Sequence, residues 1–187
     1  MRGTAEMNAD GGRTKLVLTS RWIPEKGDAG QIYNSAAFWV TPDIGLGVDY
    51  RPLVDEVNFT ATWRAFAEDP DGWRPAVIFG SAVDDFTVGD EQIESRSVFG
   101  TVSKALPRID GLNLTISPYA GAAYIHKLED LRPVGGVVLR HDFLTAIVQY
   151  SGTDTHLTLS KSITDRTSLS FILWGMELPG VAMRIAF

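Results

Sequence analysis

A serine and a histidine of this sequence could form a catalytic pair in which the serine hydroxyl is the nucleophile. The three histidines, His126, His141 and His156, fall in different predicted hairpins. A serine nucleophile needs a histidine to hold its hydroxyl and a third group to orient that histidine. His156 with Ser160 or Ser162 is the nearest set on one strand face, but no spacing requires this chemistry. We therefore predict no catalytic residue and no enzyme, with a barrel enzyme acting on lipids as an alternative.

A run of carboxylates is the second candidate for chemistry. The stretch DDFTVGDEQIE contains Asp84, Asp85, Asp90, Glu91 and Glu94. Clustered carboxylates can bind Ca²⁺ or bridge lipopolysaccharide through divalent ions, but the ordered spacing of a calcium loop is missing. We predict a solvated loop and no metal site.

Other site chemistries lack their residues or spacing. The chain contains no cysteine, which excludes thiol catalysis, disulfides and cysteine-ligated metal. Neither a phosphate-binding glycine loop nor a zinc-ligand spacing occurs, so we predict no cofactor. The net charge of -6 provides no basic surface, and nucleic acid is therefore not an expected partner.

The length of 187 residues fits one large domain. We predict an N-terminal segment, residues 1–13, followed by a single domain, residues 14–187. The first residues, MRGTAEMNADGGRTK, lack the apolar core of a signal peptide. We expect either a mature or recombinant form of an exported protein, or a protein that does not use the general secretory route.

Nearly every apolar run alternates with polar residues. In VNFTATWRAFA, apolar residues such as Phe59 and Trp63 alternate with Asn58, Thr60 and Thr62. This period of two is typical of β-strands, and helical periodicity is nowhere sustained. The pattern predicts ten to twelve strands, near residues 14–23, 32–41, 44–53, 56–68, 74–83, 96–106, 111–126, 133–141, 143–151, 155–163, 167–177 and 180–187.

The turns between these strands also show an order. Tight turns at 41–43, 141–142 and 164–166 follow even-numbered strands, and the longer segments PEKGDAGQ, DDFTVGDEQIE and KLEDLRP follow odd-numbered ones. Short turns on one rim and longer loops on the other are typical of outer-membrane barrels. We predict an all-β fold, an antiparallel up-and-down β-barrel of outer-membrane type.

The composition of the two strand faces indicates which face is enclosed. The polar face is mostly Thr, Ser, Asn, Gln and Gly with occasional Arg, which fits a polar lumen better than a surface in water. Aromatic residues near strand ends favour membrane interfaces, and these are Trp22, Trp39, Tyr50, Trp63, Trp73, Tyr124, Tyr150 and Phe187. The predicted lumen-lining residues are Arg64, Arg140, Arg184, Asp49, Thr60, Thr62 and Gln149.

Charged residues on the predicted faces lead to two further expectations. The luminal arginines could pair with Asp49 or Glu68, or line a pore that favours anions. Lys104 and Lys161 fall on the apolar face, which contradicts a membrane barrel unless they extend from strand ends into water.

The sequence finishes with GVAMRIAF, in which alternate residues are apolar and the last is aromatic. A barrel in a membrane must pair its last strand with its first, which leaves no open edge in hydrocarbon. The pattern resembles the C-terminal assembly signal of bacterial outer-membrane barrels, with Val181, Met183, Ile185 and Phe187 at the matching positions.

A second resemblance covers about residues 74–187. The succession RPAVIFGSAVDDF, VFGTVSKAL, LNLTISPYAGAAY, LTAIVQYSG and HLTLSKSITDRTSLSFIL is similar to the barrel domains of the YjbH-like outer-membrane family, which is linked to exopolysaccharide export. The opening segment TSRWIPEKGDAGQIYN departs from that family. The resemblance implies the barrel fold more than it implies a transport role.

These observations lead to one functional prediction and one main alternative. We expect a bacterial outer-membrane β-barrel that contacts the lipid bilayer and possible envelope protein partners, acting as a small-solute pore or as a structural subunit of an envelope assembly. The alternative is a water-soluble β-barrel that binds a lipid or pigment in its interior.

Overall fold

The described part of the chain forms a closed antiparallel β-barrel. A computed structural model describes residues 16–88 and 91–187, without the side chains of residues 29, 84–88, 91 and 92. Within these residues the twelve strands are β1 Leu16–Trp22, β2 Ile32–Trp39, β3 Ile44–Arg51, β4 Glu56–Phe66, β5 Ala76–Val88, β6 Glu91–Ser103, β7 Leu114–Ile125, β8 Asp130–His141, β9 Leu144–Tyr150, β10 Thr155–Ser162, β11 Thr167–Trp174 and β12 Leu178–Ala186. The predicted all-β barrel is confirmed, as is the upper end of the predicted strand count.

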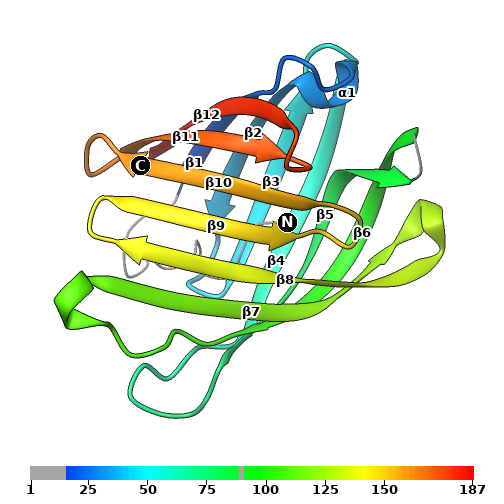
Figure 1. Ribbon diagram of the computed structural model, residues 1–187. Helices are drawn as coiled ribbons and strands as arrows, with labels where there is room; N and C mark the ends of the chain where they lie inside the picture. Colours follow the sequence, from blue (N-terminus) through cyan, green and yellow to red (C-terminus); the bar gives the residue numbers. More distant parts are fainter. Residues whose placement is uncertain (1–15, 89–90) are drawn as a thin grey trace.

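Each strand pairs with its neighbours in the sequence, and β12 pairs with β1 to complete the ring (Figure 1). The closing pair runs from Val17 opposite Ala186 to Trp22 opposite Val181. Beyond it, the Phe187 N–H donates to the Leu16 carbonyl at 2.9 Å. Closure gives every described strand a partner on both sides, which is the condition for placing a sheet in hydrocarbon. The pairing is partial between β4 and β5, where it extends from Phe66 opposite Val77 to Ala61 opposite Ser81.

The two rims carry different connections. We call the rim where β1 begins and β12 ends the terminal rim; its connections are 40–43, 67–75, 104–113 with the 3-10 turn η2 (Asp110–Leu112), 142–143 and 163–166. The opposite, distal rim carries the described connections 23–31 with helix α1 (Asp28–Gln31), 52–55, 126–129 with the 3-10 turn η3 (His126–Leu128), 151–154 and 175–177.

The predicted difference in connection length between the rims is wrong. The connections 67–75 and 104–113 lie on the terminal rim and are as long as 23–31 on the distal rim. The acidic stretch was predicted as a loop, but β5 and β6 pair through it, from Ala76 opposite Ser103 to Val88 opposite Glu91. A polar residue stays in a strand as long as the partner strand continues to pair with it. Strands β5–β8 therefore reach beyond the neighbouring shorter strands (Figure 1).

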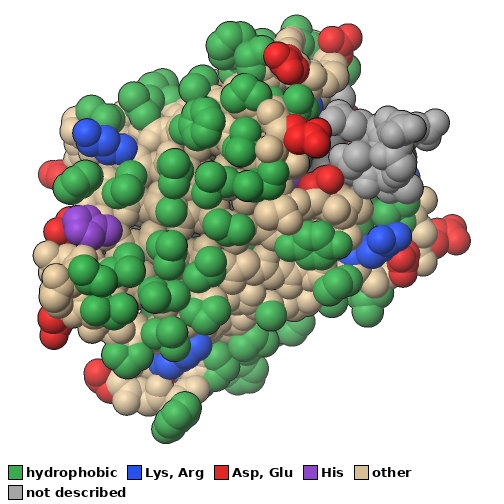
Figure 2. All heavy atoms as spheres, viewed as in Figure 1, with side chains coloured by type: hydrophobic (Ala, Val, Ile, Leu, Met, Phe, Trp, Pro, Cys, Tyr) green, Lys and Arg blue, Asp and Glu red, His purple; other side chains and the backbone are tan. Residues whose placement is uncertain are grey.

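The outer wall of the barrel is apolar all the way round. Every described strand places at least one exposed large hydrophobic side chain on it: Leu18, Phe38, Leu46, Phe59, Phe79, Val98, Tyr124, Leu131, Val148, Leu159, Phe171 and Val181, in the order of the strands. Figure 2 shows one face of this wall, where hydrophobic side chains spread over the surface and charged ones lie mainly toward its edges.

The inner face combines polar and apolar side chains. Hydroxyl and charged residues, including Ser35, Asp49, Arg51 and Thr101, are buried there. One half of the inner face departs from the predicted polar lumen, because Ile78, Phe99, Ala123 and Val134 form one apolar cluster and Tyr119, Val138 and Ile147 form another. Strands β5–β9 therefore carry apolar residues on both faces, whereas the sequence analysis predicted one apolar and one polar face.

The two lysines on the predicted apolar face lie at strand ends. Lys104 directly follows β6 and donates to the carbonyl of Asp69 at 2.5 Å. Lys161 is exposed, next to the last residue of β10, with Nζ 5.8 Å from the ring centre of Phe143. Neither ammonium group therefore needs to stay in the apolar band. In residues 16–88 and 91–187 no helix is long and apolar enough to cross a membrane.

Candidate functional site in the barrel interior

All of the predicted lumen-lining residues occupy strand positions whose side chains face the interior. Each one alternates with outward-facing neighbours and stands opposite another inward residue, as Thr60 does with Gly47 and Arg184 with Thr19. These residues are Asp49, Thr60, Thr62, Arg64, Arg140, Gln149 and Arg184. Arg140 and Arg184 lie near the terminal rim, where the neighbouring turns are 142–143 and 163–166.

Arg64 pairs with a different carboxylate from those predicted. Arg64 forms an ion pair with Asp43, with Nη2 2.6 Å from Oδ1, and it also donates to the Pro42 carbonyl at 3.1 Å. Glu68 instead pairs with Lys104 at 3.3 Å. The turn at 40–43 brings Asp43 beside Arg64 on the neighbouring strand, so this contact is local to the rim. Asp49, the other predicted partner, is buried further along β3.

A buried charge network near the distal rim was missed by the sequence analysis. Arg51 is 1% exposed, and its Nη1 lies 2.5 Å from Oε2 of Glu94 on β6. Its Nη2 also donates to the Val83 carbonyl on β5 at 3.4 Å, and Asn58 donates to Glu94 at 3.5 Å. The network joins β3 to β5 and β6, beyond the intervening strand β4. Glu94 had been grouped with the acidic loop, and no sequence spacing relates it to Arg51.

A stack of cations and aromatic rings lies on the opposite side of the interior. The Lys26 Nζ is 3.4 Å from the ring centre of Trp174, and the guanidinium of Arg21 lies 4.8 Å from the same ring. Arg21 also covers Tyr33, at 4.7 Å. Lys26 belongs to the connection 23–31 and is only 2% exposed, so its side chain enters the barrel while Glu25 and Asp28 of the same connection stay exposed. Such contacts stabilise desolvated cations.

His156 belongs to this stack, with its ring centre 4.0 Å from that of Trp174. Its Nδ1 accepts the backbone N–H of Gly175 at 3.0 Å, and its Nε2 lies 3.3 Å from the Ser151 hydroxyl. Nδ1 is therefore an acceptor, and a neutral ring carries its proton on Nε2, which donates to Ser151. This arrangement does not withdraw a proton from the serine.

The predicted pairing of His156 with Ser160 or Ser162 is not present. Ser160 makes a hydrogen bond to Ser170 on β11 at 2.8 Å. Ser160 is four residues from His156 along one strand, a separation of about 13 Å at the usual rise of about 3.3 Å per residue. The connection 151–154 folds back at the distal rim and brings Ser151 to the histidine instead.

The acidic stretch provides no metal site among the described side chains. No group of three or more His, Cys, Asp or Glu residues in this part of the chain could hold a metal ion. Asp90 lies outside the described residues, and so do the side chains of Asp84, Asp85 and Glu91. Glu94 is engaged by Arg51.

The remaining predictions concern the chain ends and the aromatic residues. Val181, Met183 and Ile185 lie on the outer wall, opposite outward residues of β1 and β11. Phe187 follows β12, is exposed and pairs with Leu16 through backbone atoms. Segment 1–13 lies outside the described residues. Trp39 differs from the predicted aromatic belt, because it lies opposite Gly45 and faces inward.

Comparison with known proteins adds no relative. No protein-family model matches the chain, and no curated protein matches it significantly. The resemblance to YjbH-like barrels and the assembly role of the last strand therefore stay predictions.

Proposed function

We propose that this protein is an integral β-barrel of the bacterial outer membrane and that it serves as a structural subunit of an envelope assembly. The observation that carries the proposal is the continuous apolar outer wall, to which every described strand contributes an exposed large side chain. In water, such a surface would be an unusually large apolar patch. In a bilayer it meets hydrocarbon, and the inner face keeps the charges away from lipid.

The interior favours a structural role over an open pore. A barrel of twelve strands falls between the filled barrels of about eight strands and the open channels of about sixteen. Side chains therefore decide whether such a lumen conducts. Here, bulky residues such as Arg51, Ile125 and His156 are buried on the inner face, and the ion pair of Arg51 with Glu94 bridges strands that are not neighbours.

Cell fractionation tests the membrane assignment. We expect the full chain, expressed with an export signal, to be found in the outer-membrane fraction and to need detergent for extraction. It should migrate differently on a gel before and after boiling, because a closed barrel resists detergent until heated. Recovery in the soluble fraction, with a lipid or pigment bound inside, would support the water-soluble alternative.

Electrical recording tests the structural role. We expect purified barrel in planar bilayers to show no stable conductance in salt solution, while a known open porin in the same bilayers conducts. Steady single-channel steps from the purified protein would contradict the structural role. Anion selectivity of those steps would assign the inward arginines to a pore.

The resemblance to YjbH-like barrels suggests which assembly the subunit serves. We propose an assembly for exopolysaccharide export, and we expect deletion of the gene to reduce secreted polysaccharide while leaving other outer-membrane proteins at normal levels. Unchanged polysaccharide secretion in the deletion strain would rule this assembly out.

A further inference from the structure

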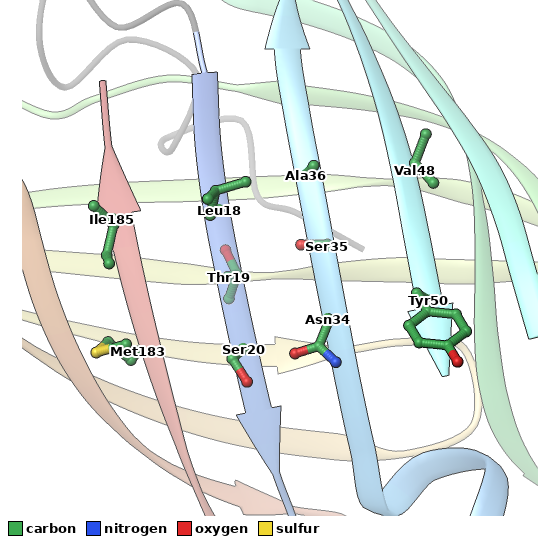
Figure 3. A pocket seen from close by; sticks show the side chains of 10 residues that line it. All are labelled: Leu18, Thr19, Ser20, Asn34, Ser35, Ala36, Val48, Tyr50, Met183 and Ile185. Carbon is green, nitrogen blue, oxygen red and sulfur yellow. The ribbon is translucent and has the colours of Figure 1, made fainter. Parts of the chain in front are cut away.

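We propose that a hollow in the outer wall over β12, β1, β2 and β3 binds one acyl chain of lipopolysaccharide, together with the linkage that joins this chain to its sugar. The inference rests on the proposed membrane location. The hollow has a volume of about 420 Å³, within the size range of ligand pockets. Figure 3 shows the side chains around it, and we call it the wall hollow.

The wall hollow is built from two rows of outward side chains that run across these strands, and the row nearer the terminal rim is apolar. In this row Ala36 lies opposite Leu18 on one side and Val48 on the other. Leu18 in turn lies opposite Ile185 of β12. The methyl group of Ala36 leaves space between the larger branched side chains on either side (Figure 3). This part of the wall hollow can therefore hold hydrocarbon.

The second row lies nearer the distal rim and is polar at its centre. Ser20 and Asn34 stand directly opposite each other, and both line the wall hollow. Within the described residues, neither the Ser20 hydroxyl nor the Asn34 amide has a hydrogen-bond partner. Because polar groups without partners are unfavourable against lipid, a ligand that supplies partners to both side chains is favoured here.

The donors and acceptors of this polar pair select the linkage of the acyl chain. A carboxamide has two N–H donors and one carbonyl acceptor, and a hydroxyl both donates and accepts. Lipopolysaccharide carries acyl chains on amide nitrogens, with a hydroxyl group near the attachment point of the chain, so its linkage offers donors as well as acceptors. The ester groups of a glycerophospholipid offer acceptors only. The Asn34 carbonyl therefore finds a donor in the linkage of lipopolysaccharide and none in a phospholipid ester.

The order of the two rows places the wall hollow in the lipopolysaccharide leaflet. β1 begins and β12 ends at the terminal rim. A barrel inserted from the periplasm leaves these two strand ends on the periplasmic side, so the distal rim lies in the outer leaflet. Tyr50 extends the polar row on β3, and its amphipathic ring favours the membrane interface. The linkage then lies beside the polar row, and the chain runs over the apolar row toward the middle of the bilayer.

Exposed charges beside the wall hollow set a condition for binding. Glu25, Asp28 and Asp55 are exposed in the adjoining connections, and Asp55 accepts a hydrogen bond from Tyr50 at 3.4 Å. These carboxylates repel the phosphate groups of lipopolysaccharide unless divalent cations screen them. Binding is therefore measured in the presence of Mg²⁺.

Native mass spectrometry of the full chain, refolded in detergent from inclusion bodies, tests the proposal. Lipid A, the acylated disaccharide of lipopolysaccharide, and phosphatidylglycerol are titrated separately, and bound lipid is counted. Both lipids are anionic, but phosphatidylglycerol has ester-linked chains only. We expect one lipid A to bind, at least about tenfold more tightly than phosphatidylglycerol, because only lipid A supplies partners for both polar side chains.

Two variants separate the polar row from the apolar one. The double variant Ser20→Ala/Asn34→Leu should bind lipid A at least about tenfold more weakly, because two hydrogen bonds of about 1 kcal/mol each are lost. Ala36→Leu, which fills the space, should abolish binding. The matched control is Ala146→Leu, which adds the same side chain to the outer wall on β9, opposite Leu139 and Leu159 and away from the wall hollow. It should bind like the wild type.

Equal binding of the two lipids, or wild-type affinity in either hollow variant, would overturn the proposal. A dimer that Ala36→Leu dissociates would also overturn it, because a second copy of the chain would then occupy the wall hollow. The assay needs only the folded barrel, which its heat-modifiable form on a gel identifies. A protein found in the outer membrane that binds no lipid A therefore contradicts this inference alone, whereas recovery in the soluble fraction contradicts the proposed function.

Discussion

The guanidinium of Arg51 is almost completely buried. Removing a charge from water costs several kcal/mol unless a close partner and further hydrogen bonds compensate. Glu94 and the Val83 carbonyl provide both, and they come from β6 and β5, beyond the intervening strand β4. The burial of this residue therefore depends on contacts between strands that are not neighbours.

We expect Glu94→Gln to destabilise the barrel by about 3 kcal/mol, because the buried guanidinium loses its close carboxylate and keeps only the longer contact with Glu56, at 4.0 Å. Urea unfolding in detergent micelles measures this. The control is Asp142→Asn, which breaks an exposed ion pair with Arg108 whose side chains are 52% and 48% exposed. Such pairs contribute about 1 kcal/mol or less. Equal losses in both variants would contradict the argument.

His156 leads to a prediction that separates structure from catalysis. His156→Leu should lower the free energy of unfolding by about 2 kcal/mol, because the Gly175 N–H loses its buried acceptor. His156→Asn keeps an acceptor near the position of Nδ1 and should recover part of that loss.

Pure wild-type protein should hydrolyse no phospholipid, since the histidine donates to Ser151. Hydrolysis that both His156→Leu and Ser151→Ala remove would favour a barrel lipase.

Adjacent strands approach each other most closely at glycines on the inner face. A Cβ on Gly121 of β7 would collide with the backbone of β6, at the Gly100 carbonyl oxygen and 2.8 Å from the Thr101 Cα. Strand pairing at this point requires a residue without a side chain.

We therefore expect Gly121→Val to prevent correct pairing of β6 with β7 and to abolish the heat-modifiable form on a gel. Ala120→Val adds the same β-branched side chain one residue away, on the exposed outer wall. It should fold normally. A heat-modifiable Gly121→Val protein would show that the two strands can separate locally without losing the barrel.

The last strand allows assembly in the cell to be separated from stability. Phe187 is 56% exposed, and its link to β1 uses backbone atoms only. We expect Phe187→Ser to refold normally in detergent but to reach the outer membrane in reduced amount. The control is Phe66→Ser, at the end of β4 on the same rim and 59% exposed. Equal amounts of both variants in the membrane would contradict an assembly signal at Phe187.

The whole molecule has its apolar side outward, so the effect of a charge depends on its depth in the wall. Leu46→Arg, near the middle of β3, should destabilise the barrel in phospholipid vesicles by about 2–4 kcal/mol, and Leu131→Arg, next to the distal rim, by about 1 kcal/mol or less. Denaturant unfolding from vesicles measures both. In a water-soluble barrel, both positions are exposed, and neither change should matter.

Much of this architecture follows from the sequence. The period of two located every strand, because side chains alternate across a strand whatever the strand pairs with. The same alternation separated the two faces in segments such as 56–66, and the composition of the polar face indicated that the apolar side is outward. The turn at EDPDGW is likewise local, with Asp69 accepting from the N–H groups of Asp71 and Gly72. These features depend on residues close together in the chain.

The interior contacts depend on residues far apart. Arg51 meets Glu94, and Lys26 meets Trp174, only because the barrel closes with a particular shift between its strands. A local pattern contains no information on that shift. For the same reason it did not reveal that β5 and β6 continue through the acidic stretch, since pairing with a partner strand, and not the residue types, holds that hairpin extended. The strands and their faces were thus determined by local sequence. The contacts inside the barrel were determined by the tertiary structure, because they join residues that are far apart in the chain and that strand pairing brings together.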